Sequence, residues 1–254
     1  MKEYVMGVDY GGTSSKAVLF DLNGVEIASA SRKVEMQMPR PGFTERDMEQ
    51  LWHANCEAIR ECIDRAGIAP RQIMGVSLSG HGKGLYLWGK DDRPARPGIV
   101  STDSRAHGIV ERWQADGVAH RAFALACQNI LASQPAALLR WLMENEPESI
   151  ERCRYIFGVK DYIRYRMTGE AAAEITDISG SGLVNLRTAQ YDSELLRLFG
   201  LETLTDKLPP LVASTEFCGV VGQTCSELTG LPTGTPVAAG LFDIDACAIG
   251  MNLC

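Results

Sequence analysis

The stretch VMGVDYGGTSSKAVLFD, Val5 to Asp21, predicts how the chain begins to fold. An apolar run ends at the carboxylate of Asp9, a glycine turn follows, and a second apolar run begins near Lys16. Such a pattern favours two strands, over residues 4–10 and 16–20, joined by a tight turn. The next residues add a third strand through Asn23-Gly24, because Asn-Gly is the strongest short hairpin signal. The sequence therefore predicts an antiparallel meander at the start of the chain.

The same stretch carries residues that suit phosphate chemistry. A carboxylate at a strand end can hold a divalent cation, and glycines let backbone N–H groups approach a phosphate closely. Thr13, Ser14 and Lys16 add hydroxyl donors and a positive charge. A plain hairpin turn is the alternative, since turns are made of these same residue types. Neither the P-loop pattern nor the dinucleotide fingerprint is present.

Composition narrows the class of ligand. The chain has 254 residues, 45% of them hydrophobic, which is enough for one large domain or two smaller ones. A formal net charge of -7 and the absence of a Lys/Arg-rich run argue against nucleic acid or an anionic membrane as a partner. We expect a small-molecule ligand instead. No apolar run approaches bilayer length and the first residues do not suit a signal peptide, so a cytoplasmic location is expected.

Cysteine and histidine spacing gives no metal signature. The eight cysteines form no C-x-x-C pair and lie mostly in apolar segments such as ACQNI, residues 126–130, so we interpret them as reduced core residues. The four histidines show no zinc-binding spacing.

The rest of the chain alternates helices and strands. Residues 46–67 form an apolar stripe at helical spacing, with Asp47 and Gln50 placed as a capping box and Gly67 as the stop. Residues 73–78 read as a buried strand, 109–150 as helical, and 155–169 as a strand passing into a helix. Residues 171–235 predict short helices and loops, and 236–240 a short strand. These elements indicate an α/β fold with a mixed central sheet flanked by helices.

Three later stretches carry polar residues suited to binding or catalysis. SGHGKG, residues 79–84, follows a strand, where open α/β sheets usually bind ligands, although a glycine loop is often only an exposed turn. STDSR, residues 101–105, offers Asp103, whose carboxylate can accept hydrogen bonds from sugar hydroxyls, or a helix N-cap. AAGLFDIDA, residues 238–246, places Asp243 beyond an apolar strand.

Asp243 has the surroundings of a general base. Phe242 and Ile244 flank it, and such desolvation raises the pKa of a carboxylate that must receive a proton from a hydroxyl. Asp245 is a rival for this role. If the strand continues, the two carboxylates share a face; if a helix begins at once, they diverge by about 200°. The alternative is that Asp243 only caps a helix.

Taken together, these stretches resemble the FGGY carbohydrate kinases. The family's opening D-x-G-[GT]-[ST]-S-x-[KR] is similar to Asp9–Lys16, and its P-G-[WF]-x-E-x-D segment to PGFTERD, residues 41–47. Its W-x-D-x-R element resembles STDSR with Ser101 for the tryptophan, and its G-G-x-x-D-x-x-A motif resembles AGLFDIDA with Ala239 for the first glycine. Order and spacing agree along the whole chain. Within the family, the L-xylulose kinase branch is the most similar.

The resemblance implies an actin-like ATPase fold of the ribonuclease-H type and transfer of a phosphoryl group from ATP to a ketose or polyol hydroxyl. It implies that Asp9 handles Mg²⁺ and that Asp243 is the catalytic base. The implied cofactor-binding residues are Asp9, Gly11, Gly12, Thr13, Ser14 and Lys16. The implied sugar-binding residues are His81, Gly82, Lys83, Asp103 and Asp243.

The resemblance also implies that residues 1–254 are an N-terminal domain, because family members carry a second, nucleotide-binding domain beyond this point. We therefore expect weak or no turnover by the isolated chain. A non-catalytic sugar-sensing module and a kinase for glycerol, ribulose or erythritol are the alternatives. A homodimer and the identity of the sugar stay open at this stage.

Overall fold

The computed structural model describes residues 3–253, and its N-terminal part is the expected meander. Strands β1 (Tyr4–Tyr10), β2 (Ser14–Asp21) and β3 (Glu26–Lys33) pair antiparallel in chain order. Alternating burial along β1 shows why: every second side chain enters the core while the others face outward. The hairpin predictions for this part of the chain are confirmed.

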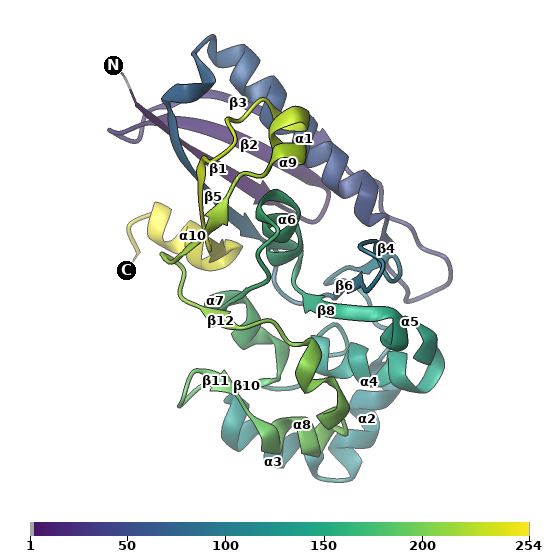
Figure 1. Ribbon diagram of the computed structural model, residues 1–254. Coiled ribbons are helices and arrows are strands. Elements are labelled where there is room, and N and C mark those ends of the chain that lie inside the picture. The colour runs from purple at the N-terminus through teal and green to yellow at the C-terminus, as the bar shows by residue number, and fades with distance from the viewer. Residues whose placement is uncertain (1–2, 254) are drawn as a thin grey trace.

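Later segments extend this meander into a mixed sheet (Figure 1). Strand β5 (Ile73–Gly80) runs parallel to β1, and β14 (Pro236–Ala238) runs parallel to β5. Strand β13 (Phe217–Val220) closes the edge antiparallel to β14, and β15 (Leu241–Phe242) pairs parallel with the end of β5. The predicted α/β class with a mixed central sheet is therefore confirmed.

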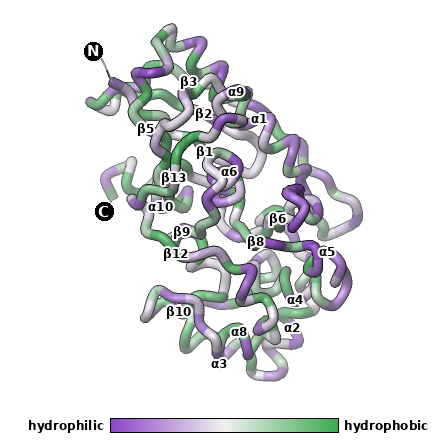
Figure 2. The backbone as a smooth tube through the Cα atoms, viewed as in Figure 1, coloured by the Kyte–Doolittle hydropathy of each residue, from purple (hydrophilic) through white to green (hydrophobic). Residues whose placement is uncertain are grey.

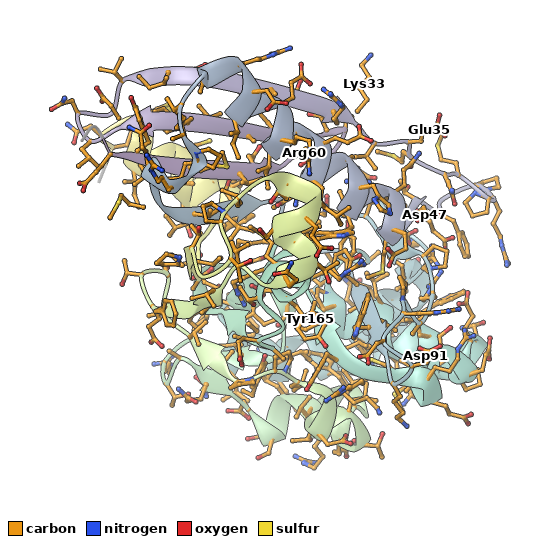
Figure 3. All side chains as sticks on the ribbon, turned by 45° about the horizontal axis from the view of Figure 1, so that its top comes forward. Lys33, Glu35, Asp47, Arg60, Asp91 and Tyr165 are labelled. Carbon is orange, nitrogen blue, oxygen red and sulfur yellow. The ribbon has the colours of Figure 1, made fainter. Side chains whose placement is uncertain are left out.

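Helix α1 (Met48–Ala66) covers β2 and β3 and is the longest helix among the described residues. Asp47 accepts hydrogen bonds from the Glu49 and Gln50 amides, and Gly67 ends the helix in the left-handed conformation. Arg60 reaches from α1 to the Leu228 carbonyl at 2.8 Å, which fastens α9 (Gln223–Thr229) beside it (Figure 3). The helix, its cap and its stop agree with the sequence prediction.

A second, mostly helical half lies below the sheet in Figure 1. Its buried apolar side chains form a cluster of their own, separate from the cluster between the sheet, α1 and α6 (Val159–Thr168). Figure 2 shows apolar stretches in both halves. The helices of the second half are α2 (His107–Ala115), α3 (Val118–Ala126), α4 (Pro135–Asn145), α5 (Pro147–Arg152) and α8 (Ser193–Phe199).

The remaining elements are short. The remaining strands are β4 (Glu45–Arg46), β6 (Tyr86–Gly89), β7 (Gly98–Ile99), β8 (Cys153–Phe157), β9 (Ala173–Glu174), β10 (Val184–Asn185), β11 (Gln190–Tyr191) and β12 (Leu211–Val212). The remaining helices are α7 (Ile175–Ile178), α10 (Asp243–Gly250) and the 3-10 turns η1 (Pro70–Gln72), η2 (Ser179–Ser181) and η3 (Glu202–Lys207). Of these elements, α7 and α10 lie, with α6, where the sheet meets the helical half (Figure 1).

Two sequence expectations need correction. Residues 171–235 contain five short strands besides helices and loops, and strands of two to four residues are too short to show a period of two. Cys127 and Cys247 are exposed, although both lie in apolar stretches that were interpreted as core. Cys127 occupies the left-handed position after α3, and α10 leaves Cys247 on its outer face. Cys254 lies outside the described residues.

The described helices include none that combines the length and the apolar character needed to cross a membrane.

Candidate active site

The glycine turn between β1 and β2 lies at the carboxyl end of β1. The Gly11 amide donates to the Ser14 carbonyl at 3.1 Å, which closes the turn, while Gly12 and Thr13 are exposed. Asp9 and Lys16 are Cα partners across the two strands, so their side chains share one face of the sheet. The predicted carboxylate, turn and lysine therefore lie together.

Asp9 keeps one oxygen for a ligand. The Ser79 hydroxyl, on the neighbouring strand β5, donates to Asp9 Oδ1 at 2.5 Å and orients the carboxylate. The side chain is only half-buried, so Oδ2 is not sealed in the core. An accessible strand-end carboxylate next to an exposed glycine turn suits a bound cation.

Asp243 lies at the same end of the sheet as Asp9. Phe242 is the Cα partner of Gly80 in the parallel ladder of β15 with β5, and Ser79 is the partner of Asp9. The carboxyl ends of the three parallel strands β1, β5 and β15 therefore bring the two carboxylates toward one edge. Asp243 is half-buried as well.

The structure decides between Asp243 and Asp245. Helix α10 begins at Asp243, and Phe242 occupies the N-cap position without a side-chain cap. Asp243 is thus the first residue of the helix rather than its cap, and Asp245 points in a direction about 200° away. The strand reading, in which both carboxylates share a face, is wrong for this chain.

The pKa of the Asp243 carboxyl is raised. Burial against the surrounding protein is the main cause, and the charges of Asp9 and Asp245 add to it. A raised pKa makes the carboxylate a better proton acceptor, as a general base requires. The effect of Asp9 on Asp243 also shows that the two groups are electrostatic neighbours.

The chain before Asp243 is held tightly. Gly240 has φ +88°, and a Cβ there would overlap the Leu78 carbonyl, so only glycine fits. Ala239 is fully buried and accommodates its methyl group, which explains why the first glycine of the family pattern is dispensable here. Arg164 donates to the Ala239 carbonyl at 2.8 Å and pairs with Asp161 at 2.7 Å. Asp243 is therefore carried on a rigid segment.

The loop after β5 packs directly against the base motif. The His81 amide donates to the Tyr10 carbonyl at 3.0 Å, and a Cβ on Gly82 would lie 2.5 Å from the Phe242 ring. Glycine at position 82 thus permits the close approach of the two segments. Lys83 is half-buried and adopts φ +61°, a left-handed conformation that is uncommon outside glycine.

His81 is neutral in this environment. Burial lowers the pKa of its imidazole to about 4, and its Nε2 lies 3.2 Å from the Tyr86 hydroxyl. Tyr86 is buried, and burial raises its pKa to about 12. Since Nδ1 lies 3.2 Å from the Gly82 carbonyl, that nitrogen carries the proton and Nε2 accepts from Tyr86.

Asp103 does not present a free carboxylate. Its Oδ2 accepts the Thr44 amide at 2.6 Å, and Arg105 pairs with the same carboxylate at 2.9 Å. The side chain is fully buried, so the expected contact with sugar hydroxyls is not supported in this conformation. Helix α2 begins only after Ala106, so Asp103 is not an N-cap either. Asp103 instead positions the PGFTERD segment.

That segment links the two halves of the site, which the sequence did not reveal. Glu45 pairs with Arg96 and Arg105, while Arg46, which is fully buried, donates to the Gly12 carbonyl in the phosphate turn. Arg46 occupies a variable position of the family pattern, so no motif marks it. An arginine inside an otherwise recognisable segment was the only available signal.

Two further residues escaped the sequence interpretation. Ser79 precedes the glycine loop and was assigned to it only as a loop residue, and Asp177 lies in a stretch expected to be short helices and loops. The sequence alone does not reveal either residue, because only the fold brings β5 beside Asp9 and α7 toward Asp243.

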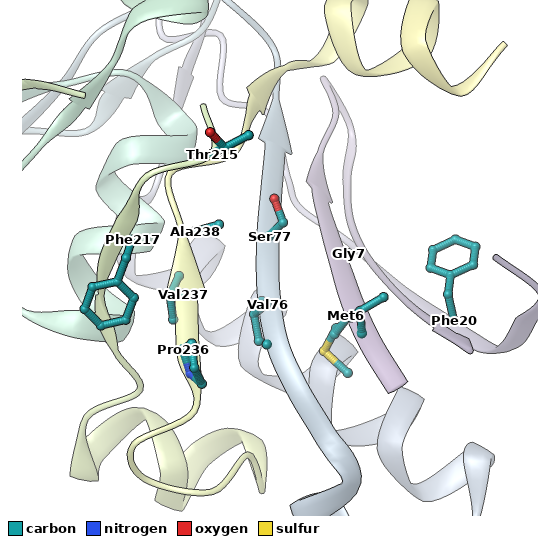
Figure 4. A pocket seen from close by; sticks show the side chains of 12 residues that line it. Met6, Gly7, Phe20, Val76, Ser77, Thr215, Phe217, Pro236, Val237 and Ala238 are labelled. Carbon is teal, nitrogen blue, oxygen red and sulfur yellow. The ribbon is translucent and has the colours of Figure 1, made fainter. Parts of the chain in front are cut away.

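An apolar cavity of about 480 Å³ lies on the open face of the sheet (Figure 4). Side chains such as Met6, Phe20 and Phe217 line it, with no charged group among its lining residues. A smaller cavity nearby includes Asp9 and Ser79 in its wall. The larger cavity therefore lacks the groups that phosphoryl chemistry needs, and the acidic edge is the candidate site.

The donor set fits a magnesium ion that is shared with a substrate. Among residues 3–253, no group of three or more His, Cys, Asp or Glu side chains could enclose a metal. Magnesium in phosphoryl-transfer sites is usually held by one or two carboxylates together with phosphate oxygens. Asp9, with one oxygen free beside an exposed turn, matches that arrangement.

The sheet and the acidic edge define a domain of the actin-like ATPase class. Comparison with solved structures agrees: xylulose kinase from Rhodospirillum rubrum superposes with a TM-score of 0.93 at 27% identity, over 99% of this chain and 51% of that one.

Sequence comparison gives the family. The model of the FGGY family of carbohydrate kinases, N-terminal domain, matches residues 4–250, and the chain belongs to this family. A probable L-xylulose kinase of Pasteurella multocida is 39% identical over 98% of this chain and 52% of its own length. The L-xylulose/3-keto-L-gulonate kinase of Escherichia coli K12 is also 39% identical, over 98% of this chain and 50% of its own length. The chain thus spans about half the length of the curated relatives it matches.

Proposed function

We propose that this chain provides the sugar site, the phosphate turn and the catalytic base of a kinase that phosphorylates a ketose or polyol with ATP. The observation that carries the proposal is the meeting of Asp9 and Asp243 at one sheet edge, with the charge of Asp9 raising the pKa of Asp243 beyond the effect of burial. A metal-binding carboxylate and a base on opposite sides of a phosphate suit in-line transfer.

The proposed acceptor is a ketopentose of the xylulose type. Support comes from the names of the Pasteurella multocida and Escherichia coli relatives, both at 39% identity. The glycine-lined loop at His81–Lys83 and the half-buried carboxylate of Asp243 offer polar groups to a small polyhydroxylated ligand.

Asp243 would act on the acceptor hydroxyl. Its desolvated carboxylate would accept the hydroxyl proton as the hydroxyl oxygen bonds the γ-phosphorus of ATP and the bond from that phosphorus to the bridging oxygen of ADP breaks, so that ADP leaves. The rigid Gly240 turn would keep the carboxylate in reach. Phosphoryl transfer needs little covalent help from the protein, so positioning and charge neutralisation supply most of the rate.

Asp9, Gly11, Gly12, Thr13, Ser14 and Lys16 would hold the phosphates and the cation. Backbone N–H groups of the exposed turn can approach phosphate oxygens, and the Lys16 ammonium offsets their charge. When bound, Mg²⁺ supplies charge neutralisation on the transferring group. Asp9 would hold it through Oδ2, while Ser79 keeps Oδ1 in place.

We also propose that residues 1–254 are the N-terminal domain and that a second domain supplies the adenosine site. The family model that matches is that of the N-terminal domain, and the curated relatives are about twice as long as the match. Because MgATP and free sugars meet in the cytosol, the proposal places the protein there. Turnover by the 254-residue chain alone should then be weak.

An acceptor panel tests the function. Sugar-dependent ADP release is measured for pentuloses, hexuloses and polyols, with the protein that carries this chain and with the 254-residue chain alone. The proposal expects turnover with a ketopentose in the first and little in the second. Sugar binding without any turnover in either would favour a sensing module instead.

A further inference from the structure

One face of the central sheet is covered and the other is largely open. On the covered face, Tyr4 and Tyr10 of β1 pack in the cluster that α1, α6 and α9 share. On the open face, Val5 is exposed, and the apolar cavity of about 480 Å³ extends across β13, β14, β5 and β1 (Figure 4). Phe217, which lines this cavity, is 66% exposed. A contiguous apolar hollow of this kind on a surface is typical of an interaction site.

Small residues form part of the cavity wall. A Cβ on Gly7 would lie 3.9 Å from the Phe20 ring, and one on Gly75 would lie 3.4 Å from the Pro236 carbonyl, so both positions have room for a side chain. Neither glycine has a positive φ. Nothing within the described structure therefore requires glycine at these two strand positions. Glycine inside a strand often marks a place where another backbone approaches closely.

Helix α10 is an apolar helix that lacks a packing partner. None of its residues is buried, although apart from the two carboxylates of its first turn it is apolar. Ile244 is 65% exposed and Ile249 is 55% exposed, and Met251 and Leu253, which follow the helix, are exposed as well. A helix that is apolar on all sides is normally enclosed by other parts of a protein. The described residues do not supply that enclosure for α10.

The cavity and α10 belong to one surface. Gly7, Phe20 and Ser77 line both the large cavity and the smaller one that has Asp9 in its wall. Ala246 of α10 lines the smaller cavity too. We refer to the two cavities and α10 together as the apolar groove. It extends from β13 to the edge of the candidate active site.

The second domain proposed above is the partner that suits this groove. The matching family model is that of an N-terminal domain, and the Pasteurella multocida relative is about twice as long as the match. The larger cavity has no charged lining residue, so an apolar segment fits it better than a charged one. A second copy of this chain in the groove would instead cover Asp9, the carboxylate that the proposed cation and phosphates must reach.

We propose that the apolar groove is the docking surface of the second domain, which buries α10 and lays an apolar segment across β1, β5 and β14. The inference rests on the proposed function, because that proposal supplies the second domain. Docking would also fix α10, whose first residue is the proposed base Asp243. The two domains would then meet beside Asp9, where MgATP and the sugar have to come together.

Two native cysteines allow a test without any substitution. Cys247 on α10 is exposed, and so is Cys127, which follows α3 in the helical half. The rate at which N-ethylmaleimide alkylates each thiol is measured by peptide mass spectrometry, at several protein concentrations. The 254-residue chain alone is compared with the protein that carries this chain.

We expect alkylation of Cys247 to be slower by about tenfold or more in the longer protein, because a docked domain encloses α10, and that of Cys127 to be equal within about twofold. In the 254-residue chain alone, both thiols should react at rates that do not depend on protein concentration.

A matched pair of substitutions tests the sheet side of the groove. Phe217→Asp places a charge in the large cavity, and Phe123→Asp places one at a half-exposed phenylalanine of α3, away from the groove. Phe217→Asp should lower the thermal midpoint of the longer protein by about 3 °C or more, and that of the 254-residue chain by about 1 °C or less. Phe123→Asp should shift both midpoints equally.

Two results would overturn the inference. One is equal alkylation of Cys247 in the two proteins. The other is protection of Cys247 in the 254-residue chain that grows with protein concentration, which would assign the groove to a second copy. The acceptor panel is run on the same preparations: absent turnover with a protected Cys247 would count against the proposed kinase function and still support the docking surface.

Discussion

The proposed chemistry depends most on Asp243, the proposed proton acceptor. The pKa of Asp243 is raised by burial first and then by the charges of Asp9 and Asp245. A general base works only when ionised, so the rate should decline as the pH falls through this raised pKa. The acid side of the rate profile therefore reports the surroundings of Asp243.

Removing the Asp245 charge tests that link. In Asp245→Asn, the pKa of Asp243 should move down, and the acid limb of kcat/KM should shift to lower pH with the maximum rate retained. The measurement is the pH profile of sugar-dependent ADP release. If the acid limb of kcat/KM lies at the same pH in Asp245→Asn and wild type, a group other than Asp243 controls that limb.

Arg46 makes a second residue-level prediction. Its buried guanidinium donates to the carbonyl of the exposed Gly12, so Arg46→Ala frees the phosphate turn and leaves a cavity where the buried arginine side chain lay. We expect the KM for ATP to rise about tenfold and the free energy of unfolding to fall by about 1–3 kcal/mol, with sugar affinity little changed.

Arg71→Ala, on the exposed side of η1, is the matched control for Arg46 and should alter neither quantity. An Arg46→Ala variant with an unchanged KM for ATP would show that the turn does not depend on this contact.

The positions of site residues were predictable where a motif names the residue, and unpredictable where contacts between distant segments decide the surroundings of a side chain. The positions of Asp9 and Asp243 agree with what the sequence implied. Asp103 was expected to face the sugar because its motif does not show that Arg105 and the Thr44 amide occupy its carboxylate. Arg46 and Asp177 gain their surroundings only from segments distant in sequence.

At the scale of elements, the turn before α10 sets the position of the base. Gly240 combines a left-handed backbone with a close approach to the Leu78 carbonyl. Gly117, at the start of α3, has a similar φ of +69° but nothing within 4 Å of its Cβ position in the described structure. A comparison of these two glycines therefore separates the cost of a left-handed backbone from the cost of steric overlap.

We expect Gly117→Ala to cost about 1 kcal/mol of unfolding free energy and Gly240→Ala about 3 kcal/mol or more, because only the latter adds a clash. Thermal melts should show a difference of roughly 2–4 °C for each kcal/mol in a chain of this size. Equal losses in the two variants would remove the close approach as an explanation for the glycine.

Element prediction succeeded where periodicity was long. The β1–β3 meander, α1 with its cap, β5, and the passage from β8 into α6 all agree with the sequence. The ladder of β6 with β8 and that of β9 with β12 did not emerge, because these partners are far apart in sequence, and the local β10–β11 ladder is too short to show a pattern. The hydrophobic pattern of a short stretch cannot indicate a ladder that is only two residues long.

On the scale of the whole molecule, the site lies where two apolar clusters meet. One cluster joins the sheet to α1 and α6, and the other fills the helical half. Between them lies the buried polar group of Lys160, Asp161, Arg164, Glu174 and Asp177. The stability of the molecule should therefore respond to the protonation of Asp177, its unpaired member.

Asp177 predicts the sign of that response. Its pKa is raised from 3.8 to about 8, so between these values the folded state holds a proton that the unfolded state releases. This group's contribution to stability is then lost progressively as the pH rises across that window. Urea midpoints of wild type and Asp177→Asn should diverge with increasing pH, in favour of the variant. Parallel curves would mean that Asp177 is already ionised in the folded protein.

The central claim is that Asp243 removes the proton from a sugar hydroxyl opposite the cation site at Asp9. The most direct measurement is the turnover number of Asp243→Asn alongside its sugar dissociation constant, in the protein that carries this chain. The account predicts a loss of about 10²–10⁴-fold in turnover with sugar affinity within threefold of wild type. Turnover equal to wild type would contradict it.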